Sequence, residues 1–259
     1  MSDNRLDHVV RSVVGAVREA VVEEQVTFEE YRAAIGYMMK IAEAGELPLF
    51  IDVFMNSTIV DVINRGSHPE ASPSDMEGPY FVEGVPHVDG TIKTMDAYKD
   101  DEPLVVRGYV KDVSGTALPD VTLDIWSSTP DGKYGGIHDG IPKDYYRGKI
   151  KTDENGYFQV KTTVPVPYQI PHSGPVGAMM DMMGRHTWRP AHVHVKIRED
   201  GYRELITQLY FEGDPYVGSD CCEGIVPPEF VFPRRVEDGK RIIETTLKIE
   251  PLAEVPEAA

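Results

Sequence analysis

Residues 189–197 have the sequence Arg-Pro-Ala-His-Val-His-Val-Lys-Ile, and this stretch decides the expected fold. Apolar and polar side chains alternate along its second half, so every second residue shares one face of an extended strand. The valines and the isoleucine then face a core, while His192 and His194 lie on the opposite face, about 7 Å apart at the backbone. Two imidazoles in this arrangement can bind one metal ion, although the same pattern also fits a plain polar strand face.

The same period of two recurs from about residue 104 onward. The runs 104–110 and 121–125 alternate in this way, and glycine, proline, asparagine and aspartate separate the runs. Many short strands with turn signals between them, and without alternating helices, are typical of an antiparallel β-sandwich or barrel. We therefore expect a mainly β protein with an antiparallel β-sandwich core and a helical N-terminal part.

The N-terminal part of the chain follows a helical period instead. Apolar residues form one stripe over 9–21, a second helix is expected around 31–41, and a third, more uniformly apolar segment lies over 47–63. Thr27 and Glu30 have the spacing of a capping box, in which each side chain accepts a hydrogen bond from a free backbone N–H of the first turn. These helices carry more hydrophobic surface than they can hide among themselves.

Glycine, serine and proline are concentrated between residues 64 and 75, a composition that marks a domain boundary. We expect a helical dimerisation or linker domain over residues 1–75, followed by the β-sandwich domain over residues 76–250. The Ala, Glu and Pro residues of the tail, 251–259, are expected to be disordered.

The chain is strongly acidic and contains few cysteines. Its 259 residues include 43 acidic and 26 basic side chains, a net charge of -17, which argues against nucleic acid or an anionic membrane as a partner. Cys221 and Cys222 are the only cysteines, and adjacent residues rarely meet disulfide geometry, so we expect a reducing, cytoplasmic environment. The N-terminus lacks a signal-peptide pattern and no apolar run approaches roughly 20 residues, so we expect neither export nor a membrane span.

Further metal ligands are only weakly indicated by the residues alone. Few carboxylates flank the histidine pair and the cysteines lack a C-x-x-C spacing, so a zinc finger and a 2-His-1-carboxylate site are both poorly supported. Tyr134 lies in the glycine-containing loop 131–136 and Tyr168 in the proline-rich turn 165–171, and functional side chains tend to lie in such loops. Either tyrosine also fits a packing role.

Taken in order, these segments resemble the intradiol ring-cleavage dioxygenases, and among them the chlorocatechol 1,2-dioxygenase branch. The resemblance covers nearly the whole chain and is carried by Glu77–Phe81, Asp124–Trp126, the two tyrosine loops, Gly184–His194 and Leu205–Gln208. It implies an enzyme of aromatic and chloroaromatic degradation that uses one non-haem iron(III) per subunit. The positions that match the family's iron ligands are Tyr134, Tyr168, His192 and His194.

The resemblance also implies the reaction and the catalytic residues. Both atoms of O2 enter a catechol or chlorocatechol, which is cleaved to a cis,cis-muconate. Tyr168 is the ligand that leaves the metal as the substrate binds, Arg189 stabilises developing negative charge, and Gln208 completes the polar wall. Phenolates are hard, strongly donating ligands, so two tyrosines favour iron(III) over iron(II).

The expected substrate pocket lies between the last N-terminal helix and the segment that leads into the sandwich. Leu49, Asp52 and Val53 are spaced to share one face of a helix. The positions that match the family's pocket are Leu49, Asp52, Val53, Met76, Gly78, Pro79, Tyr80 and Cys222. A pocket separates analogues that differ by one small group by only ~1–3 kcal/mol, so the preferred ring substitution is not predicted.

The N-terminal helices also predict how the chain assembles, and other functions fit the same residues. The surplus apolar face of the helices predicts a homodimer through these helices. The resemblance implies the same dimer, which in the family often forms around a bound phospholipid. Within the same fold, plain catechol and hydroxyquinol are alternative substrates. Outside the family, the alternatives are a non-enzymatic β-sandwich binding module and a zinc hydrolase that uses the histidine pair.

Overall fold

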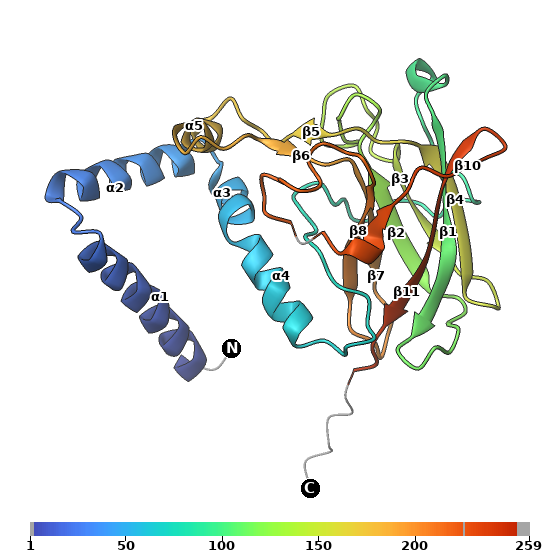
Figure 1. Cartoon of the computed structure of the whole chain (residues 1–259), viewed down its shortest axis with the longest axis horizontal. Coiled ribbons are helices and arrows are strands. Elements are labelled where there is room, and N and C mark those ends of the chain that lie inside the picture. The colour runs from blue at the N-terminus through green and yellow to red at the C-terminus, as the bar shows by residue number, and fades with distance from the viewer. Residues whose placement is uncertain (1–2, 225, 253–259) are drawn as a thin grey trace, which may run out of the picture. The chain divides into compact units, whose positions relative to one another are not determined.

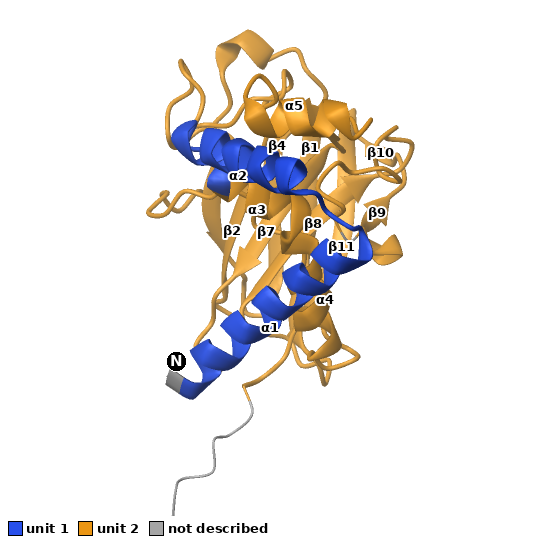
Figure 2. Cartoon of the chain, turned by 90° about the vertical axis from the view of Figure 1, so that its left-hand side faces the viewer, with its two compact units in different colours: residues 1–47 blue, residues 48–259 orange. Residues whose placement is uncertain are grey.

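The computed structural model of the protein describes residues 3–224 and 226–252. The chain divides into two compact units, residues 1–47 and 48–259, which Figure 2 shows in different colours. The helical segment expected over 1–75 is therefore shared between them, because its last helices belong to the second unit. Most of the tail expected from residue 251, namely 253–259, lies outside the described residues. Pro251 and Leu252 are described, and Leu252 N–H donates to the Gly201 carbonyl at 2.8 Å.

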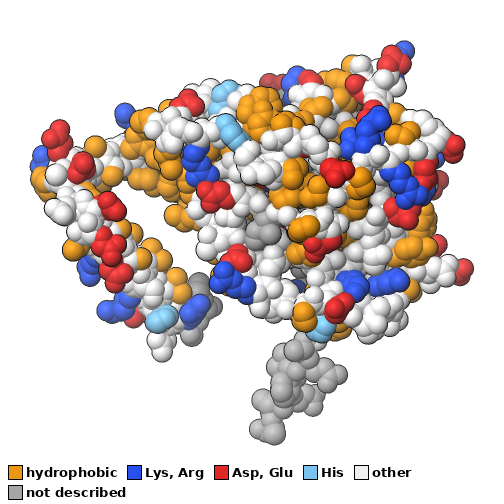
Figure 3. All heavy atoms as spheres, viewed as in Figure 1, with side chains coloured by type: hydrophobic (Ala, Val, Ile, Leu, Met, Phe, Trp, Pro, Cys, Tyr) orange, Lys and Arg blue, Asp and Glu red, His pale blue; other side chains and the backbone are white. Residues whose placement is uncertain are grey.

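The first unit consists of two helices, α1 (Asp3–Glu23) and α2 (Phe28–Glu43). The predicted capping box is confirmed, since Thr27 N–H donates to the Glu30 carboxylate at 2.8 Å and Glu30 N–H donates to the Thr27 hydroxyl at 3.2 Å. Apolar side chains remain exposed along α1, and the space-filling view shows orange side chains on these helices (Figure 3). The exposed aliphatic residues of α1 are Leu6, Val9, Val10, Val13, Val14, Val17, Val21 and Val22.

The segment predicted as one helix over 47–63 forms two helices, α3 (Leu47–Phe54) and α4 (Asn56–Arg65). Asn, Ser and Thr open α4, and their short polar side chains compete with helical backbone hydrogen bonds in a helix interior, which favours a new start there. The Asn56 amide donates to the Asp52 carboxylate at 3.2 Å across the break. Among the described residues no single helix is long and apolar enough to cross a bilayer, and only the α3–α4 pair, bent by 48°, passes by length and composition together.

The second unit is built on two sheets and a small ribbon (Figure 1). The first sheet has the order β10 (Val236–Glu237), β11 (Lys240–Ile249), β1 (Pro103–Asp112) and β4 (Tyr157–Thr163). The second has the order β3 (Arg147–Lys151), β2 (Thr122–Ser127), β7 (His192–Ile197), β8 (Leu205–Phe211) and β9 (Val231–Phe232). The ribbon pairs β5 (Tyr168–Gln169) with β6 (Trp188–Arg189). Short 3-10 helices lie at Asp96–Tyr98 and Pro228–Phe230.

One core takes side chains from both sheets. Leu104 and Val106 of β1, with Leu247 of β11, are buried in the same cluster as Val193 and Val195 of β7. Two sheets that enclose a common core are the arrangement of a β-sandwich, so the predicted fold class is confirmed. The description as antiparallel is corrected at two places, since β1 pairs with β11 and β8 with β9 in parallel. Long connections separate these partners along the chain, which is what parallel pairing requires.

Helix α5 (Pro175–Met182) was not expected from the sequence. Pro171, Gly174 and Pro175 look like a turn, yet proline is well suited to the first position of a helix because its missing N–H would have had no partner there. Gly177 lies where a Cβ would come within 2.0 Å of the His172 carbonyl oxygen, so the helix packs closely on the preceding loop.

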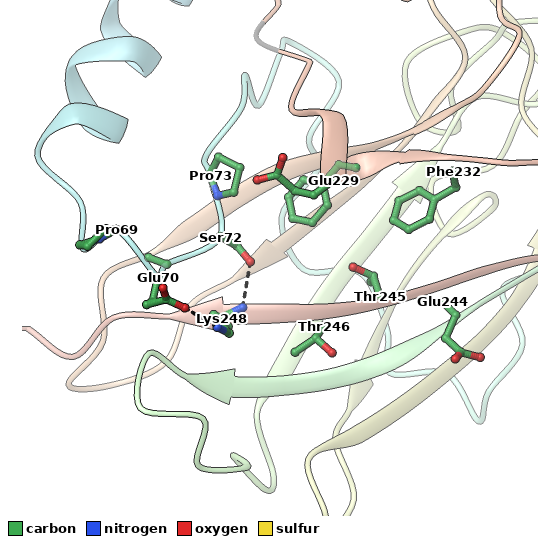
Figure 4. A pocket seen from close by; sticks show the side chains of 12 residues that line it. Pro69, Glu70, Ser72, Pro73, Glu229, Phe232, Glu244, Thr245, Thr246 and Lys248 are labelled. Carbon is green, nitrogen blue, oxygen red and sulfur yellow. Dashed lines mark hydrogen bonds and ion pairs between the residues drawn. The ribbon is translucent and has the colours of Figure 1, made fainter.

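The linker that follows α4 is fixed both to α4 and to the sandwich by hydrogen bonds. Ser74 N–H donates to the Asn64 side-chain oxygen at 2.7 Å, and Ser72 N–H donates to the Lys248 carbonyl of β11 at 2.9 Å. Figure 4 shows Lys248 bound to both Ser72 and Glu70 beside a shallow groove of about 390 Å³. None of the expected site residues lines this groove. The contacts of Lys248 with Ser72 and Glu70 hold the linker in place, and with it the start of residues 75–81.

Candidate metal centre and active site

The two histidines of β7 meet at their ring nitrogens. Each side chain is 1% exposed, and the two Nε2 atoms are 3.0 Å apart. His192 Nδ1–H donates to the Pro190 carbonyl at 2.7 Å, which leaves Nε2 as the ring nitrogen with a free lone pair. Two metal–nitrogen bonds of about 2.1 Å that meet at a right angle place their nitrogens about 3 Å apart. The pair therefore has the spacing of two adjacent ligands of one ion.

Burial keeps both imidazoles neutral. It lowers the pKa of His192 to about 3, with the Arg189 cation adding to the effect. It lowers the pKa of His194 well below the usual range, with the neighbouring His192 as the second cause. His194 also stacks on Trp126, with ring centroids 4.4 Å apart and ring planes only 3° from parallel. Neutral and fixed imidazoles are the form that binds a metal.

Tyr134 and Tyr168 lie beside this pair. Tyr134 comes from the loop between β2 and β3, and Tyr168 from β5, and their ring centroids are 5.3 Å apart. The Tyr134 ring lies 6.5 Å from that of His194, and the Tyr168 ring 5.7 Å from that of His192. Gly132 allows the loop to pass this closely, because a Cβ there would come within 3.0 Å of Tyr168 Cβ and its φ is +83°. The structure thus brings together all four predicted ligands.

The two phenols are buried in a way that suits a cation between them. Burial raises the pKa of Tyr134 well above its usual range and also raises the pKa of Tyr168. Within the described residues the buried Tyr134 hydroxyl makes no hydrogen bond of good geometry, and its interaction with the Tyr168 phenol adds to the rise of its pKa. A buried polar atom without a partner carries a substantial free-energy cost, which a bound cation would remove. Two phenol oxygens and two neutral imidazoles fit iron(III), because phenolate oxygen is a hard donor.

Arg189 is a buried cation that contacts this group, and the buried Arg147 also lowers the pKa of His194. Arg189 is 4% exposed, and its Nη2 lies 2.8 Å from the Asp220 carboxylate, while Nε lies 3.2 Å from both Asp220 oxygens. Its Nη1 is 3.5 Å from the Tyr168 hydroxyl, and Nη2 donates to the Gln208 side-chain oxygen at 3.2 Å. Arg189 and Tyr168 are register partners in the ribbon, so the backbone fixes their distance. Asp220 was missed as a site residue, since it lies 31 positions from Arg189.

A second layer of hydrogen bonds holds Gln208. Its Nε2 donates to the Met76 carbonyl at 2.6 Å, and its side-chain oxygen lies 3.0 Å from the Tyr210 hydroxyl. Tyr210 also lies 2.5 Å from the Asp75 carboxylate. Burial is the main cause that raises the pKa of Asp75 to about 6. Neither Asp75 nor Tyr210 was predicted, because their partnership spans 135 positions of sequence.

Ionisation of Asp75 is expected to cost stability at neutral pH. A carboxyl group whose pKa is higher in the folded than in the unfolded chain stabilises the fold below its unfolded pKa, and this contribution is lost as the pH rises through the folded pKa. The unfolding free energy of Asp75→Asn minus that of the parent should therefore increase by about 1.5 kcal/mol from pH 5 to pH 8. Urea unfolding at both pH values measures the difference. A difference that is constant or shrinks with rising pH would contradict this assignment.

A narrow cavity opens onto Tyr168 and Arg189 from the side of α3. Of the eight predicted pocket positions, Val53 is buried and lies outside the lining, and the cavity also touches Asn56, Ile170 and Pro171, which were not predicted. Burial raises the pKa of Asp52, which lies half-buried in this wall. The predicted positions that line the cavity are Leu49, Asp52, Met76, Gly78, Pro79, Tyr80 and Cys222.

Both the helical N-terminal segment and the β-sandwich match models of known protein families. A family model described as "Catechol dioxygenase N terminus" matches residues 3–72, and one described as "Dioxygenase" matches residues 76–249. A chlorocatechol 1,2-dioxygenase of Pseudomonas sp. strain P51 is 49% identical over 96% of this chain and 97% of its own length. The chain belongs to the intradiol ring-cleavage dioxygenases, in the chlorocatechol branch. This membership rules out the non-enzymatic binding module and the zinc hydrolase.

Solved structures of the intradiol dioxygenases agree in fold. The crystal structure of chlorocatechol 1,2-dioxygenase from Pseudomonas putida superposes with a TM-score of 0.91 at 47% identity, covering 96% of this chain and 99% of that one. A hydroxyquinol 1,2-dioxygenase of a Rhizobium strain is more distant, at 32% identity over 93% of this chain and 84% of its own.

Proposed function

We propose that this chain cleaves chlorocatechols between the two hydroxyl-bearing carbons, with both atoms of O2 entering the product, a chloro-cis,cis-muconate. The assignment of the substrate rests on sequence identity. The chain is 49% identical to a chlorocatechol 1,2-dioxygenase over nearly its whole length, against 32% identical to a hydroxyquinol 1,2-dioxygenase. Plain catechol and hydroxyquinol remain the alternative substrates. The reaction places the enzyme in the degradation of chlorinated aromatic compounds.

Tyr134, Tyr168, His192 and His194 would hold one iron ion per subunit. Intradiol dioxygenases use non-haem iron, and two phenolate donors favour its iron(III) state. When bound, iron(III) would act as a Lewis acid that lowers the pKa of the catechol hydroxyls and prepares the ring for reaction with O2. The support within this chain is the 3.0 Å spacing of the imidazole nitrogens and the buried Tyr134 hydroxyl, which makes no hydrogen bond of good geometry among the described residues.

Tyr168 serves as the proton acceptor for the incoming substrate. Tyr168 lines the cavity and burial raises its pKa, so a free Tyr168 phenolate takes up a proton readily. A catechol that binds in place of this phenolate can transfer a hydroxyl proton to the Tyr168 oxygen. In the structure the Tyr168 oxygen lies 3.5 Å from Arg189 Nη1, which can hydrogen-bond to it.

Arg189 and Gln208 stabilise the charge that develops on the substrate. The guanidinium is fixed by Asp220 and by Gln208, so it needs little reorganisation when negative charge appears beside it. The pocket above it is lined mainly by apolar and aromatic groups that exclude water, with Asp52 and Cys222 as polar or polarizable neighbours of a ring substituent.

The reaction and the substrate are tested by turnover of catechol, 3-chlorocatechol, 4-chlorocatechol and hydroxyquinol, followed by muconate absorbance. We expect the highest kcat/KM with one of the chlorocatechols. A preference for hydroxyquinol, or cleavage outside the two hydroxyl-bearing carbons, would overturn the proposal.

The exposed stripe of α1 supports a homodimer formed through the N-terminal helices, with a phospholipid bound there. Val13→Asp combined with Val17→Asp puts charges on two side chains that are 59% exposed in the single chain, and it is expected to yield monomers in size-exclusion chromatography with light scattering. Ser12→Asp, a polar residue of the same helix, is the control and should remain dimeric. A parent protein that is monomeric at micromolar concentration would contradict the dimer. The free thiols agree with a cytoplasmic location.

A further inference from the structure

Cys221 and Cys222 form a pair of free thiols next to the candidate site. Their Sγ atoms are 3.8 Å apart, and the two side chains are 3% and 6% exposed. They are the only cysteines in the chain. Consecutive Cα atoms lie about 3.8 Å apart across a trans peptide, below the usual range for a disulfide, so the pair is better suited to remain a dithiol than to close on itself.

The turn that carries the pair is held from several directions. Cys221 N–H donates to the Trp188 carbonyl at 3.1 Å, and the Cys221 carbonyl accepts from Arg185 Nη2 at 2.9 Å. Cys222 N–H donates to the Asp220 carboxylate at 3.0 Å. The two thiols are therefore fixed beside one another before any ligand arrives. Such preorganisation favours a ligand that binds both sulfurs at once over one that binds a single sulfur.

We propose that Cys221 and Cys222 form a chelating site for trivalent arsenicals, which aryl arsenicals reach through the substrate cavity. Two bonds of about 2.3 Å, the length of a zinc–thiolate bond, span a separation of 3.8 Å at a tetrahedral angle. Arsenic–sulfur bonds are of similar length. The S–As–S angle at arsenic(III) is narrower than tetrahedral, so the two sulfurs must move closer together by a few tenths of an ångström. The hydrogen bond with Cys222 raises the pKa of Cys221, which disfavours reagents that need a free thiolate.

The binding step is a condensation. With phenylarsine oxide, two As–S bonds form, the As–O bond and two S–H bonds break, and one water molecule leaves with both thiol protons. Arsenic stays in the trivalent state, so no oxidant or reductant takes part. The phenyl group is the third substituent of arsenic, and no further protein ligand is needed.

The lining of the cavity explains why the site should prefer arsenicals that carry an aryl group. It also explains why binding should inhibit turnover. Cys222 shares the cavity wall with Pro79, Tyr80 and Ile170, which offer aromatic and apolar surface to a phenyl ring. The same cavity leads to Tyr168 and Arg189. A phenylarsenic group on this dithiol therefore occupies space that a catechol needs. This last consequence rests on the proposed function, whereas binding itself does not.

The test treats the iron-loaded protein with one equivalent of phenylarsine oxide in excess glutathione. We expect intact-protein mass spectrometry to show one phenylarsenic group per chain, lost on addition of 2,3-dimercaptopropanol, and turnover reduced at least tenfold until that addition. Cys221→Ala keeps the thiol in the cavity wall but removes the chelate. It should retain parental turnover, carry no adduct in glutathione and resist the inhibitor. Saturating catechol without O2 should slow adduct formation in the parent.

Three results would overturn the proposal. One is the absence of an adduct on the parent protein, and another is an adduct on Cys221→Ala that survives glutathione equally well. The third is a full adduct with unchanged turnover, because the proposal places the phenyl group in the cavity that a catechol needs. Since the mass measurement needs no substrate, a failure of arsenical binding is distinguishable from a wrong reaction assignment.

Discussion

Tyr168→Phe is expected to fold like the parent protein and to lose at least two orders of magnitude in kcat. The substitution removes one hydroxyl and keeps the ring that packs against Tyr80, Tyr134 and His192. The hydroxyl has a long contact of 3.5 Å with Arg189 and a weak interaction with the Tyr134 phenol, so the unfolding free energy should change by only about 1 kcal/mol. The loss of turnover follows from the loss of the oxygen that we propose binds the metal and accepts a proton, since a positioned acid or base contributes about 10²–10⁴-fold.

The measurement is the rate of muconate formation at saturating substrate, with urea unfolding alongside. Tyr146→Phe is the matched control, because Tyr146 is also buried and its hydroxyl accepts a hydrogen bond from Met95 N–H at 3.0 Å, away from the candidate site. We expect the control to lose stability and keep its turnover. Unchanged turnover in Tyr168→Phe would remove Tyr168 from the reaction.

Arg189→Lys is expected to lower kcat by about 10²–10³-fold while KM changes little, as for the removal of a fixed donor to developing negative charge. A lysine keeps the positive charge beside Asp220, so the buried carboxylate is not left unpaired. It loses the planar fork that reaches Asp220, Gln208 and Tyr168 together. Only the fixed geometry of the charge is changed.

Steady-state kinetics with a chlorocatechol measures this effect. Arg203→Lys, in an ion pair with Glu250 at 3.2 Å, is a control with the same chemical change and should behave like the parent. Asp220→Asn should show the Arg189→Lys defect in milder form, because the guanidinium keeps its fork but loses a charged partner. Equal kcat in Arg189→Lys and in the parent would show that a point charge is enough.

The fold was predictable where the pattern is local. The alternation at 192–197 predicted β7, and the Thr27–Glu30 spacing predicted the start of α2. The parallel pairing of β1 with β11 was not predictable, because alternation is the same whichever way a neighbour runs. The break near Met55 lies within a largely apolar stretch, and the Asn, Ser and Thr residues after it are the local signal for the new helix start.

The candidate site was predictable only in part from the residues themselves. The spacing of His192 and His194 alone placed two imidazoles on one strand face. Nothing local distinguishes Tyr134 from a packing tyrosine, since its place is set by the path of a loop around Gly132. Asp75 and Asp220 acquire their roles only after folding brings them to Tyr210 and Arg189. These contacts had no sequence signal beyond the resemblance to the family.

The most direct measurement is the metal content and visible absorption spectrum of the purified protein. We expect one iron per chain and a broad visible band from phenolate-to-iron(III) charge transfer, which shifts when catechol is added without O2. The band should be altered in Tyr134→Phe, because the Tyr134 hydroxyl is buried and makes no hydrogen bond of good geometry among the described residues. A colourless protein that holds stoichiometric zinc, or an iron protein whose band is identical in Tyr134→Phe and Tyr168→Phe, would contradict a centre built from two phenolates and two imidazoles.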